Sequence, residues 1–400
     1  MTKTDERRCY PTSAAELQRR WAAVRALMPA AGVDALIVQG SNNSNGTAGF
    51  FRWFTGTSVY SSYPQTVLFP QDGLMTLVWQ GGFGDAKDFA GNNPELPGIG
   101  LRLGVPAFPS VNYCKDMEAE AVAGEVRRNG FRKLGIVAPQ NMLFGFGVKL
   151  QQLLPDVAFV DATELVEPIK AIKSEEEIAF IRQAAVMQDE IVAKVRAHIR
   201  PGMRDFEVMA YAQYLGQLMG SETGYFLGCS APPGEPLGMR RRADQNRVIR
   251  DGDLFMFQCE NTGPGGQFVH LGRVLSLGKV PQEAADIFGR IVEAQDFTIS
   301  LLKPGAACRD IWAEYNDFMR SKGLPEEKRL HCHGQGYDVV ERPMIRHDES
   351  MAIAPAMNIG IHPNSGGHPR VFVTVCDNFL VGSDGRLERL HATPREIIEL

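Results

Sequence analysis

The 400-residue chain has little cysteine, little histidine and no long apolar run. Its 7 cysteines are scattered, odd in number and without a close CxxC pair, a pattern typical of reduced thiols that argues against a disulfide framework. The apolar runs have strand length, so no segment is expected to span a membrane. The polar residues 1–8 lack the apolar core of a signal peptide. We therefore expect a cytoplasmic protein without a membrane partner.

The sequence also has no large excess of either sign of charge. The chain has 42 Lys and Arg against 47 Asp and Glu, which gives a net charge of −5 and a pI of about 6.0. The short run Arg240-Arg241-Arg242 is the one basic cluster that stands out. Because nucleic-acid surfaces need extended basic patches, we expect no nucleic-acid partner.

The first part of the sequence alternates helix and strand signals. Residues 14–28 carry apolar side chains at helical spacing, and residues 34–38 form a short buried-strand run. Two further strand-like runs, residues 66–69 and 74–79, flank a Pro-Gln-Asp-Gly segment with hairpin-turn chemistry. The alternation predicts an α/β domain over residues 1–165.

The rest of the sequence has longer helical patterns. Ser174 and Glu177 are spaced as a capping box, which predicts a helix start. Further helices are expected over residues 205–219, 282–302 and 308–322, and strands over residues 254–257, 272–277 and 371–375. Helices packed on an antiparallel or mixed sheet indicate an α+β domain over residues 166–400.

Several landmarks resemble, in order and over nearly the whole chain, those of one family. They are Phe54-Thr55-Gly56, Lys173-Ser174 with Glu177, Asp251-Gly252-Asp253, Lys303-Pro304-Gly305, His333-Gly334-Gln335-Gly336, Asn378-Phe379-Leu380 and Thr393-Pro394. The chain thereby resembles the creatinase, aminopeptidase P and prolidase family. The resemblance implies a creatinase-like N-terminal domain, a pita-bread catalytic domain and a homodimer.

The resemblance also implies where a metal site would lie. Metal-dependent relatives hold two divalent ions with two Asp, one His and two Glu, whose carboxylates bridge the ions. At those positions this chain has Gln258, His270, His333, His362 and Cys376. Because the carboxylate ligands are missing, a bridged pair of hard ions is not expected. The spacing from Gln258 to His270 is one residue off the usual pattern, so Cys259 or Glu260 could take the first position.

Three interpretations of this site stay open. In the favoured one the site needs no cofactor, as in creatinase, and works by acid–base chemistry. In the second, a single softer ion such as zinc or iron binds to imidazoles and a thiolate, which suit it. Its ligands would be His270, His333, His362 and Cys376. In the third, drift has filled a dead site with arbitrary residues.

Other residues are candidates for the surrounding pocket. His333 is the preferred general base, with His270 and His362 beside it and Glu260 or Glu341 as substitutes. Gln258 and Cys376 would bind the substrate. Arg240 and Arg241 could clamp a substrate carboxylate, although a solvated loop is the plainer interpretation. Tyr60 and Tyr63 could wall the partner subunit's pocket, or serve strand packing instead.

These residues lead to a functional hypothesis. The expected activity is that of a creatinase-type small-molecule hydrolase, which cleaves a C–N bond in a nitrogenous carboxylic acid and is not a dinuclear metallopeptidase. Creatine is a poor substrate candidate, because Gly272 and His362 replace the guanidinium-binding carboxylates. The alternatives are a lyase resembling dimethylsulfoniopropionate lyase, an Xaa-Pro peptidase and a non-catalytic binding module.

Overall fold

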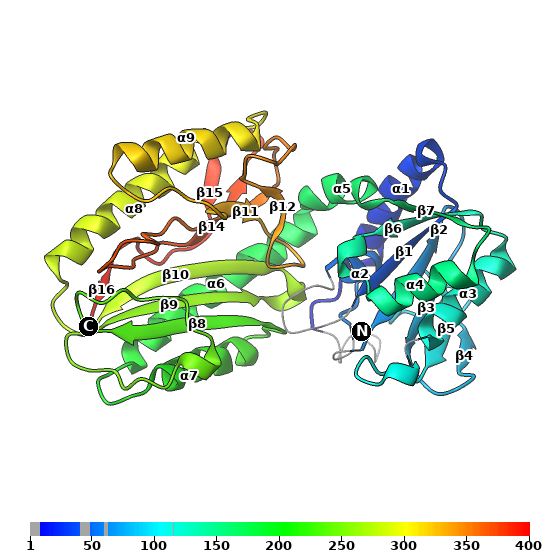
Figure 1. Cartoon of the computed structure of the whole chain (residues 1–400), viewed down its shortest axis with the longest axis horizontal. Coiled ribbons are helices and arrows are strands. Elements are labelled where there is room, and N and C mark those ends of the chain that lie inside the picture. The colour runs from blue at the N-terminus through cyan, green and yellow to red at the C-terminus, as the bar shows by residue number, and fades with distance from the viewer. Residues whose placement is uncertain (1–8, 41–48, 60–62, 115) are drawn as a thin grey trace. The chain divides into compact units, whose positions relative to one another are not determined.

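The chain folds into two compact units. The computed structural model describes residues 9–40, 49–59, 63–114 and 116–400 (Figure 1). Unit 1 is Met1–Lys170 and unit 2 is Ala171–Leu400. The domain boundary predicted at residue 165 lies a few residues before this division.

Unit 1 contains a seven-stranded mixed sheet with the strand order β4-β5-β3-β2-β1-β6-β7. The strands are β1 (Ala35–Gly40), β2 (Gln65–Pro70), β3 (Met75–Gln80), β4 (Ala86–Asp88), β5 (Ile99–Val105), β6 (Lys133–Val137) and β7 (Ala158–Asp161). The longer helices are α1 (Ala14–Ala31), α2 (Gly49–Thr55), α3 (Met117–Asn129) and α4 (Phe144–Leu153). Apolar side chains of α3 and α4 pack with Ala35, Ile37 and Leu68 on one face of the sheet.

The hairpin predicted from turn chemistry is present. β2 and β3 pair antiparallel, with Thr66 opposite Val78. Gly73 in the connection has φ of +91°, a left-handed conformation that costs glycine little. The helix predicted over residues 14–28 is also confirmed, since α1 covers that segment and ends at Gly32.

Unit 2 is built from two sheets and four long helices. The helices are α6 (Glu175–His198), α7 (Asp205–Leu218), α8 (Gln282–Leu301) and α9 (Cys308–Ser321), and the short α5 (Glu167–Ala171) leads into the unit. The first sheet has the order β16-β10-β9-β8, with β8 (Gly224–Ala231), β9 (Leu254–Thr262), β10 (Phe268–Ser276) and β16 (Ile398–Glu399). The second has the order β12-β11-β13-β14-β15, with β11 (Cys332–Gly334), β12 (Glu341–Met344), β13 (Asn358–Ile361), β14 (Asp377–Val381) and β15 (Leu387–Arg389).

The alternation along β9 determines which side chains can form a site. Phe255 and Phe257 pack in a core cluster with α6 and α7. Met256 belongs to a different cluster, which contains residues of α8 and α9. Since successive strand residues point to opposite faces, Gln258 and Glu260 share the face of Met256. That face is turned away from α6 and α7.

The predicted helices of unit 2 are confirmed to within a residue at their ends. The capping box at the start of α6 is formed, because the Glu177 amide donates to Ser174 Oγ at 3.2 Å and the Ser174 amide donates to Glu177 Oε2 at 2.9 Å. The strand predicted over residues 371–375 is wrong. Only Thr374 makes an isolated bridge there, to Asn364, although the valines of the segment fill a core cluster.

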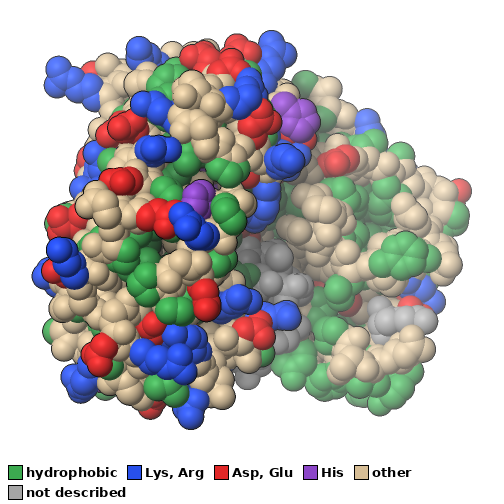
Figure 2. All heavy atoms as spheres, turned by 60° about the vertical axis from the view of Figure 1, so that its left-hand side comes forward, with side chains coloured by type: hydrophobic (Ala, Val, Ile, Leu, Met, Phe, Trp, Pro, Cys, Tyr) green, Lys and Arg blue, Asp and Glu red, His purple; other side chains and the backbone are tan. Residues whose placement is uncertain are grey.

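The surface of unit 2 has no dominant sign of charge on the face that Figure 2 brings forward. Acidic and basic side chains among the described residues are interspersed there. Within the described residues, no helix is both long and apolar enough to cross a membrane.

Candidate functional site

Three histidine rings gather in unit 2 from three different elements. His270 lies on β10, His333 on β11, and His362 follows β13. Their ring centroids are 5.3 Å apart for His270 and His333, 5.2 Å for His270 and His362, and 5.0 Å for His333 and His362. All three side chains are buried. We refer to His270, His333 and His362 as the imidazole cluster.

Strand pairing brings these rings together. β11 and β13 are antiparallel neighbours, with His333 opposite Gly360, so His362 lies two residues further along the same chain. The His362 amide donates to the His331 carbonyl at 2.8 Å. The first sheet joins the second through the His270 amide, which donates to Asn378 Oδ1 at 2.8 Å.

Glu260 completes the cluster from the neighbouring strand. It stands directly opposite His270 in the β9–β10 pair. Its Oε1 lies 3.7 Å from His270 Nδ1 and accepts a short hydrogen bond from Gln258 Nε2. The other amide atom of Gln258, Oε1, is buried and has no partner within the described residues. The carboxylate therefore lies beside His270, and the unpartnered carbonyl oxygen lies near Gly272, next to Cys376.

Burial sets the charge state of the cluster. It lowers the pKa of His333 to about 3, with the charge of His270 as the next cause. Burial also lowers the pKa of His362 well below its usual value, and His333 and His270 add to this. For Glu260, burial acts to raise the pKa, but hydrogen bonding and charge from His270 outweigh it and lower the pKa. The site thus combines the neutral imidazoles of His333 and His362 with an ionised carboxylate.

Gly360 is a site residue that the sequence analysis missed. A Cβ on this residue would lie 2.0 Å from His270 Nε2. The His270 ring can therefore take this position only because residue 360 is a glycine. Its position two residues before His362 in a strand, on the same face, was the available signal.

Cys376 lies beside the cluster as a neutral thiol. It forms an isolated bridge with Gly272, and its Sγ is 3.7 Å from the His270 carbonyl oxygen. Burial raises its pKa well above the usual range, and the charge of Glu260 adds to this. A neutral buried thiol is a weaker metal ligand than a thiolate, so the imidazoles are the better donors here.

A buried network of hydrogen bonds lies next to the cluster. Asn378 Nδ2 donates to Gln335 Oε1 at 2.8 Å and to Asn358 Oδ1 at 2.9 Å. The Asn378 amide donates to His391 Nδ1 at 3.2 Å, which leaves the proton of that ring on Nε2, 3.1 Å from Gln188 Oε1. We call these side chains the amide network; its members are Gln188, Asn261, Gln335, Asn358, Asn378 and His391.

The other predicted pocket residues lie elsewhere or are already paired. Glu341 forms a buried ion pair with Lys173 at 2.7 Å, so it is held as a structural carboxylate. Arg240 and Arg241 are exposed, and Arg241 pairs with Asp244 at 3.3 Å. They follow the end of β8 at Ala231, which pairs with Leu254, whereas Tyr225 at the other end pairs with Glu260.

The two tyrosines belong to unit 1. Tyr63 packs its ring against Phe108, with centroids 5.7 Å apart. Tyr60 lies outside the described residues. The structure therefore brings together Gln258, Glu260, the imidazole cluster and Cys376, whereas Arg240 and Arg241 lie beyond the opposite end of β8. The role of Tyr60 and Tyr63 in the partner subunit's pocket stays a prediction.

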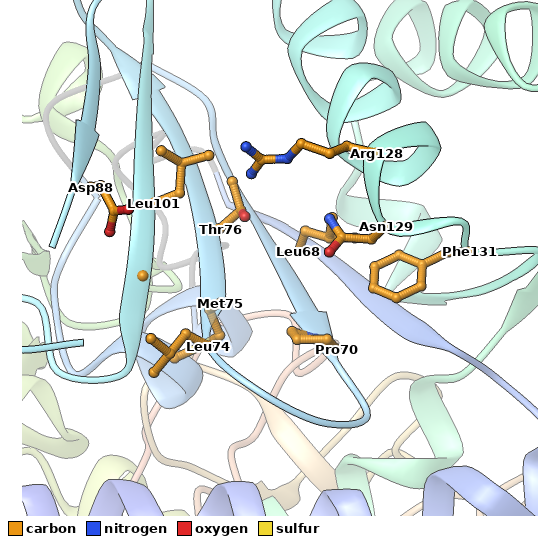
Figure 3. Close-up of a pocket in the computed structure, with 11 residues that line it drawn as sticks. Leu68, Pro70, Leu74, Met75, Thr76, Asp88, Leu101, Arg128, Asn129 and Phe131 are labelled. Atoms are coloured by element: carbon orange, nitrogen blue, oxygen red, sulfur yellow. The ribbon is translucent and has the colours of Figure 1, made fainter. Parts of the chain in front are cut away.

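Unit 1 has a separate pocket of about 230 Å³ between β2, β3, β5 and the end of α3 (Figure 3). Its lining combines leucine side chains and Phe131 with the polar side chains of Thr76, Asp88 and Arg128. Arg128 forms an ion pair with Glu125. The pocket holds none of the residues singled out by the sequence.

The donor set decides which metal the imidazole cluster suits. Both ring nitrogens of His270 and Nε2 of His362 are buried and lack hydrogen-bond partners within the described residues. His333 Nδ1 lies 2.8 Å from the Gly334 carbonyl, so this nitrogen carries the proton and Nε2 keeps its lone pair. One Glu and three His suit a single zinc or iron ion, but not a pair bridged by carboxylates. As the side chains lie in the described residues, no group of three or more His, Cys, Asp or Glu could hold a metal ion.

Comparisons with known proteins identify the class. The chain belongs to metallopeptidase family M24, which matches residues 179–383, and residues 20–172 match the creatinase/prolidase N-terminal domain. The expected family is confirmed, together with an α/β N-terminal domain and an α+β pita-bread C-terminal domain.

Relatives and solved structures cover most of the chain. An uncharacterized hydrolase/peptidase of Sinorhizobium fredii is 26% identical over 96% of this chain and 98% of its own. An Xaa-Pro dipeptidase of Pyrococcus horikoshii is 24% identical over 67% of this chain and 76% of its own. Prolidase from Thermococcus sibiricus superposes with a TM-score of 0.79 at 19% identity, covering 96% of this chain and 99% of that one.

These relatives correct the functional expectation. The prediction of a creatinase-type, non-peptidase hydrolase is wrong, because the chain matches a metallopeptidase family and relatives named as dipeptidases and an Xaa-Pro dipeptidase. The expectation that no cofactor is needed is also unsupported, since family M24 is a metallopeptidase family. Loss of the bridging carboxylates therefore does not by itself exclude a peptidase.

Proposed function

We propose that this protein is a metal-dependent hydrolase of small peptides, of the dipeptidase type, with its active site at the imidazole cluster. The observation that carries the proposal is the gathering of His270, His333 and His362 beside Glu260 in the domain that matches a metallopeptidase family. Relatives named as dipeptidases support an amide bond as the target. Xaa-Pro dipeptides are the first substrates to test.

The proposed cofactor is a single transition-metal ion, zinc or iron. His270, His333 and His362 would hold it through ring nitrogens, and burial keeps the rings of His333 and His362 uncharged, so these two need no prior deprotonation. When bound, such an ion would act as a Lewis acid toward the substrate carbonyl.

The remaining polar groups can position a peptide. Gln258 Oε1 is buried and unpartnered within the described residues, so it can accept a hydrogen bond from a substrate N–H. Cys376 is a neutral thiol, which argues against a nucleophilic role. The proposed chemistry is therefore attack by water, not formation of a covalent intermediate on the protein.

We further propose that the protein acts as a cytoplasmic homodimer. The support for a dimer is what the family resemblance implies, and the support for the cytoplasm is that the scattered cysteines form no disulfide. Light scattering of the purified full-length protein measures the subunit number directly. A monomer that hydrolyses peptides at full rate would contradict the dimer and leave the activity standing.

The test of function measures ion content and hydrolysis on the same preparation. We expect about one zinc or iron per chain by elemental analysis, cleavage of at least one Xaa-Pro or other dipeptide by mass spectrometry, and loss of both on treatment with a chelator. His270→Ala, His333→Ala and His362→Ala should each weaken ion binding by at least about tenfold.

His347→Ala is the matched control, because His347 is an exposed histidine in the same unit. It should keep the ion content and rate of the parent protein. Two ions per chain would contradict the single-ion site. An ion-free protein that hydrolyses dipeptides would contradict the role of the metal, and one that binds ion but cleaves no peptide would contradict the activity.

A further inference from the structure

We infer that Arg329 binds the carboxylate of the substrate, so that the site selects peptides whose free carboxyl terminus adjoins the scissile amide. This inference rests on the proposed function, because it names the substrate class of the same site, and it does not depend on a bound ion. Arg329 thereby takes the part that the sequence suggested for Arg240 and Arg241, which lie beyond the opposite end of β8.

The position of Arg329 along the chain keeps it near the imidazole cluster. It lies in the connection between α9 and β11, four residues before His333. Four residues of chain span at most about 14 Å. Two residues after Arg329, the His331 carbonyl accepts the amide of His362 at 2.8 Å. The chain at Arg329 therefore leads directly into the segment that carries one ring of the cluster and contacts another.

The positive charge of Arg329 acts on those two rings. Burial is the main cause that lowers the pKa of His333 and of His362, the neighbouring imidazoles come next, and the charge of Arg329 adds to both. The interaction between two charges weakens as they move apart. The guanidinium of Arg329 is therefore close enough to the cluster to meet a negative group that binds there.

The guanidinium of Arg329 has no carboxylate partner among the described residues. The acidic residues that precede it are engaged elsewhere. Glu326 forms an ion pair with Arg320. Glu327 Oε1 accepts the backbone amides of Arg329 and Leu330, at 2.7 and 3.0 Å. Because the Arg329 side chain is exposed, a carboxylate from solution can reach it.

The backbone that carries this side chain is held from both sides by α9. Before Arg329, buried Asn316 donates to the Glu327 carbonyl at 3.2 Å and accepts the Glu327 amide at 2.8 Å. After it, the His331 ring stacks on Tyr315 with centroids 3.5 Å apart. A fixed backbone with a side chain that is not already paired lowers the cost of ordering a binding residue.

The chemistry of the guanidinium identifies the ligand as a carboxylate. Its planar donors match the two oxygens of a carboxylate in a bidentate pair. In a dipeptide, the carboxylate belongs to the residue that follows the scissile amide, so a cation beside the reacting groups meets it. A longer peptide has a neutral amide at that place. Arg329 therefore favours dipeptides over longer peptides and over peptides with a blocked carboxyl terminus.

The experiment uses two analogues of alanyl-proline in which a methylene replaces the peptide carbonyl, so that neither can be hydrolysed. One analogue keeps the free carboxylate and the other carries a carboxamide. By isothermal titration calorimetry, we expect the full-length parent to bind the free acid about 10- to 100-fold more tightly than the carboxamide. Arg329→Met should bind the free acid about 10- to 100-fold more weakly than the parent does, and the carboxamide equally well.

Lys328→Met is the matched control, because Lys328 is the adjacent residue and is also an exposed cation. This variant should bind both analogues like the parent. A general effect of charge in this loop would weaken binding of the free acid in both variants, whereas a specific pair with Arg329 weakens it in one.

Each contrary result has its own meaning. Equal affinity of the parent for the two analogues would overturn the inference, and so would selectivity that survives in Arg329→Met or disappears in Lys328→Met. Binding of neither analogue would also overturn it, and hydrolysis of dipeptides by the same preparation would then leave the proposed function standing. Selective binding of the free acid by a parent that hydrolyses no dipeptide would refute the proposed function and leave the carboxylate subsite in place.

Discussion

At the scale of single residues, the site depends on an absent side chain as much as on the histidines. His270 Nε2 faces the space that a Cβ on residue 360 would occupy, at 2.0 Å. A side chain at residue 360 would therefore force the His270 ring to move, because the clash is with the first side-chain atom.

Gly360→Ala is predicted to displace the His270 ring, abolish hydrolysis and weaken zinc binding by at least about tenfold. Overpacking of this kind also costs about 1–3 kcal/mol of stability. Urea unfolding and zinc titration measure the two effects separately. Gly289→Ala on α8 is the matched control, because nothing lies within 4 Å of its Cβ. That helical substitution should keep zinc affinity and stabilise slightly. Equal behaviour of the two variants would refute the role of Gly360.

Some residues of the candidate site were predictable and others were not. Sequence spacing and family resemblance singled out His270, His333 and His362, which the fold brings together. The pairing of Glu260 with His270 needed the strand register, which spacing alone left ambiguous. Arg241 could not be excluded from the sequence, because its partner Asp244 is set by the local turn.

At the scale of elements, a buried ion pair ties the beginning of α6 to β12. Lys173 Nζ lies 2.7 Å from Glu341 Oε2, and the two side chains are only 3% and 5% exposed. Lys173 immediately precedes the capping residue Ser174, so the pair joins the start of the helix to the strand next to β11. A buried pair of this kind is strongly destabilising to break from one side only.

Lys173→Met is predicted to lower the free energy of unfolding by about 3–5 kcal/mol, because it leaves the Glu341 carboxylate buried without its cation. Lys173→Met combined with Glu341→Gln should recover most of that loss. Urea unfolding monitored by circular dichroism gives both values. Lys194→Met removes a cation from an exposed pair with Glu190 and serves as the control, with an unchanged midpoint. Failure of the double variant to recover would show that the pair is not the cause.

The elements themselves were largely predictable where a local signal existed. The capping box at Ser174 and Glu177 marked the start of α6, and turn chemistry marked the β2–β3 connection. Residues 371–375 misled the analysis because alternating valines occur in strands and also in an irregular segment that fills a core. Only tertiary pairing distinguishes the two cases, and there only Thr374 pairs.

At the scale of the whole molecule, each unit has its own hydrophobic core, and unit 1 contains a buried carboxylate with a raised pKa. Glu118 on α3 of unit 1 is buried, and its carboxylate accepts hydrogen bonds from Thr66 and Gln39. Burial raises its pKa to about 7, although those hydrogen bonds act in the opposite direction. The folded pKa therefore lies above the unfolded value of about 4.3.

Folded unit 1 keeps the Glu118 proton to a higher pH than the unfolded chain does. The contribution of Glu118 to the free energy of unfolding should therefore be largest below about pH 4.3 and should be lost as the pH rises through about 7. The expected loss is about 3 kcal/mol, and Glu118→Gln should abolish it. Tryptophan fluorescence follows unit 1, since Trp21, Trp53 and Trp79 lie there and only Trp312 lies in unit 2. A free energy of unfolding of unit 1 that increases toward pH 7 would contradict the raised pKa of Glu118.

The amide network has a consequence for how such a site can change over generations. Asn378 donates to Gln335 and Asn358 while accepting from His270, so each group is the partner of another. Replacing one member of the amide network leaves buried donors or acceptors of its neighbours without hydrogen-bond partners. Replacing a residue outside the network does not have this effect. In proteins that descend from this one, we therefore expect the residues of the amide network to stay unchanged together, and the residues around the network to vary.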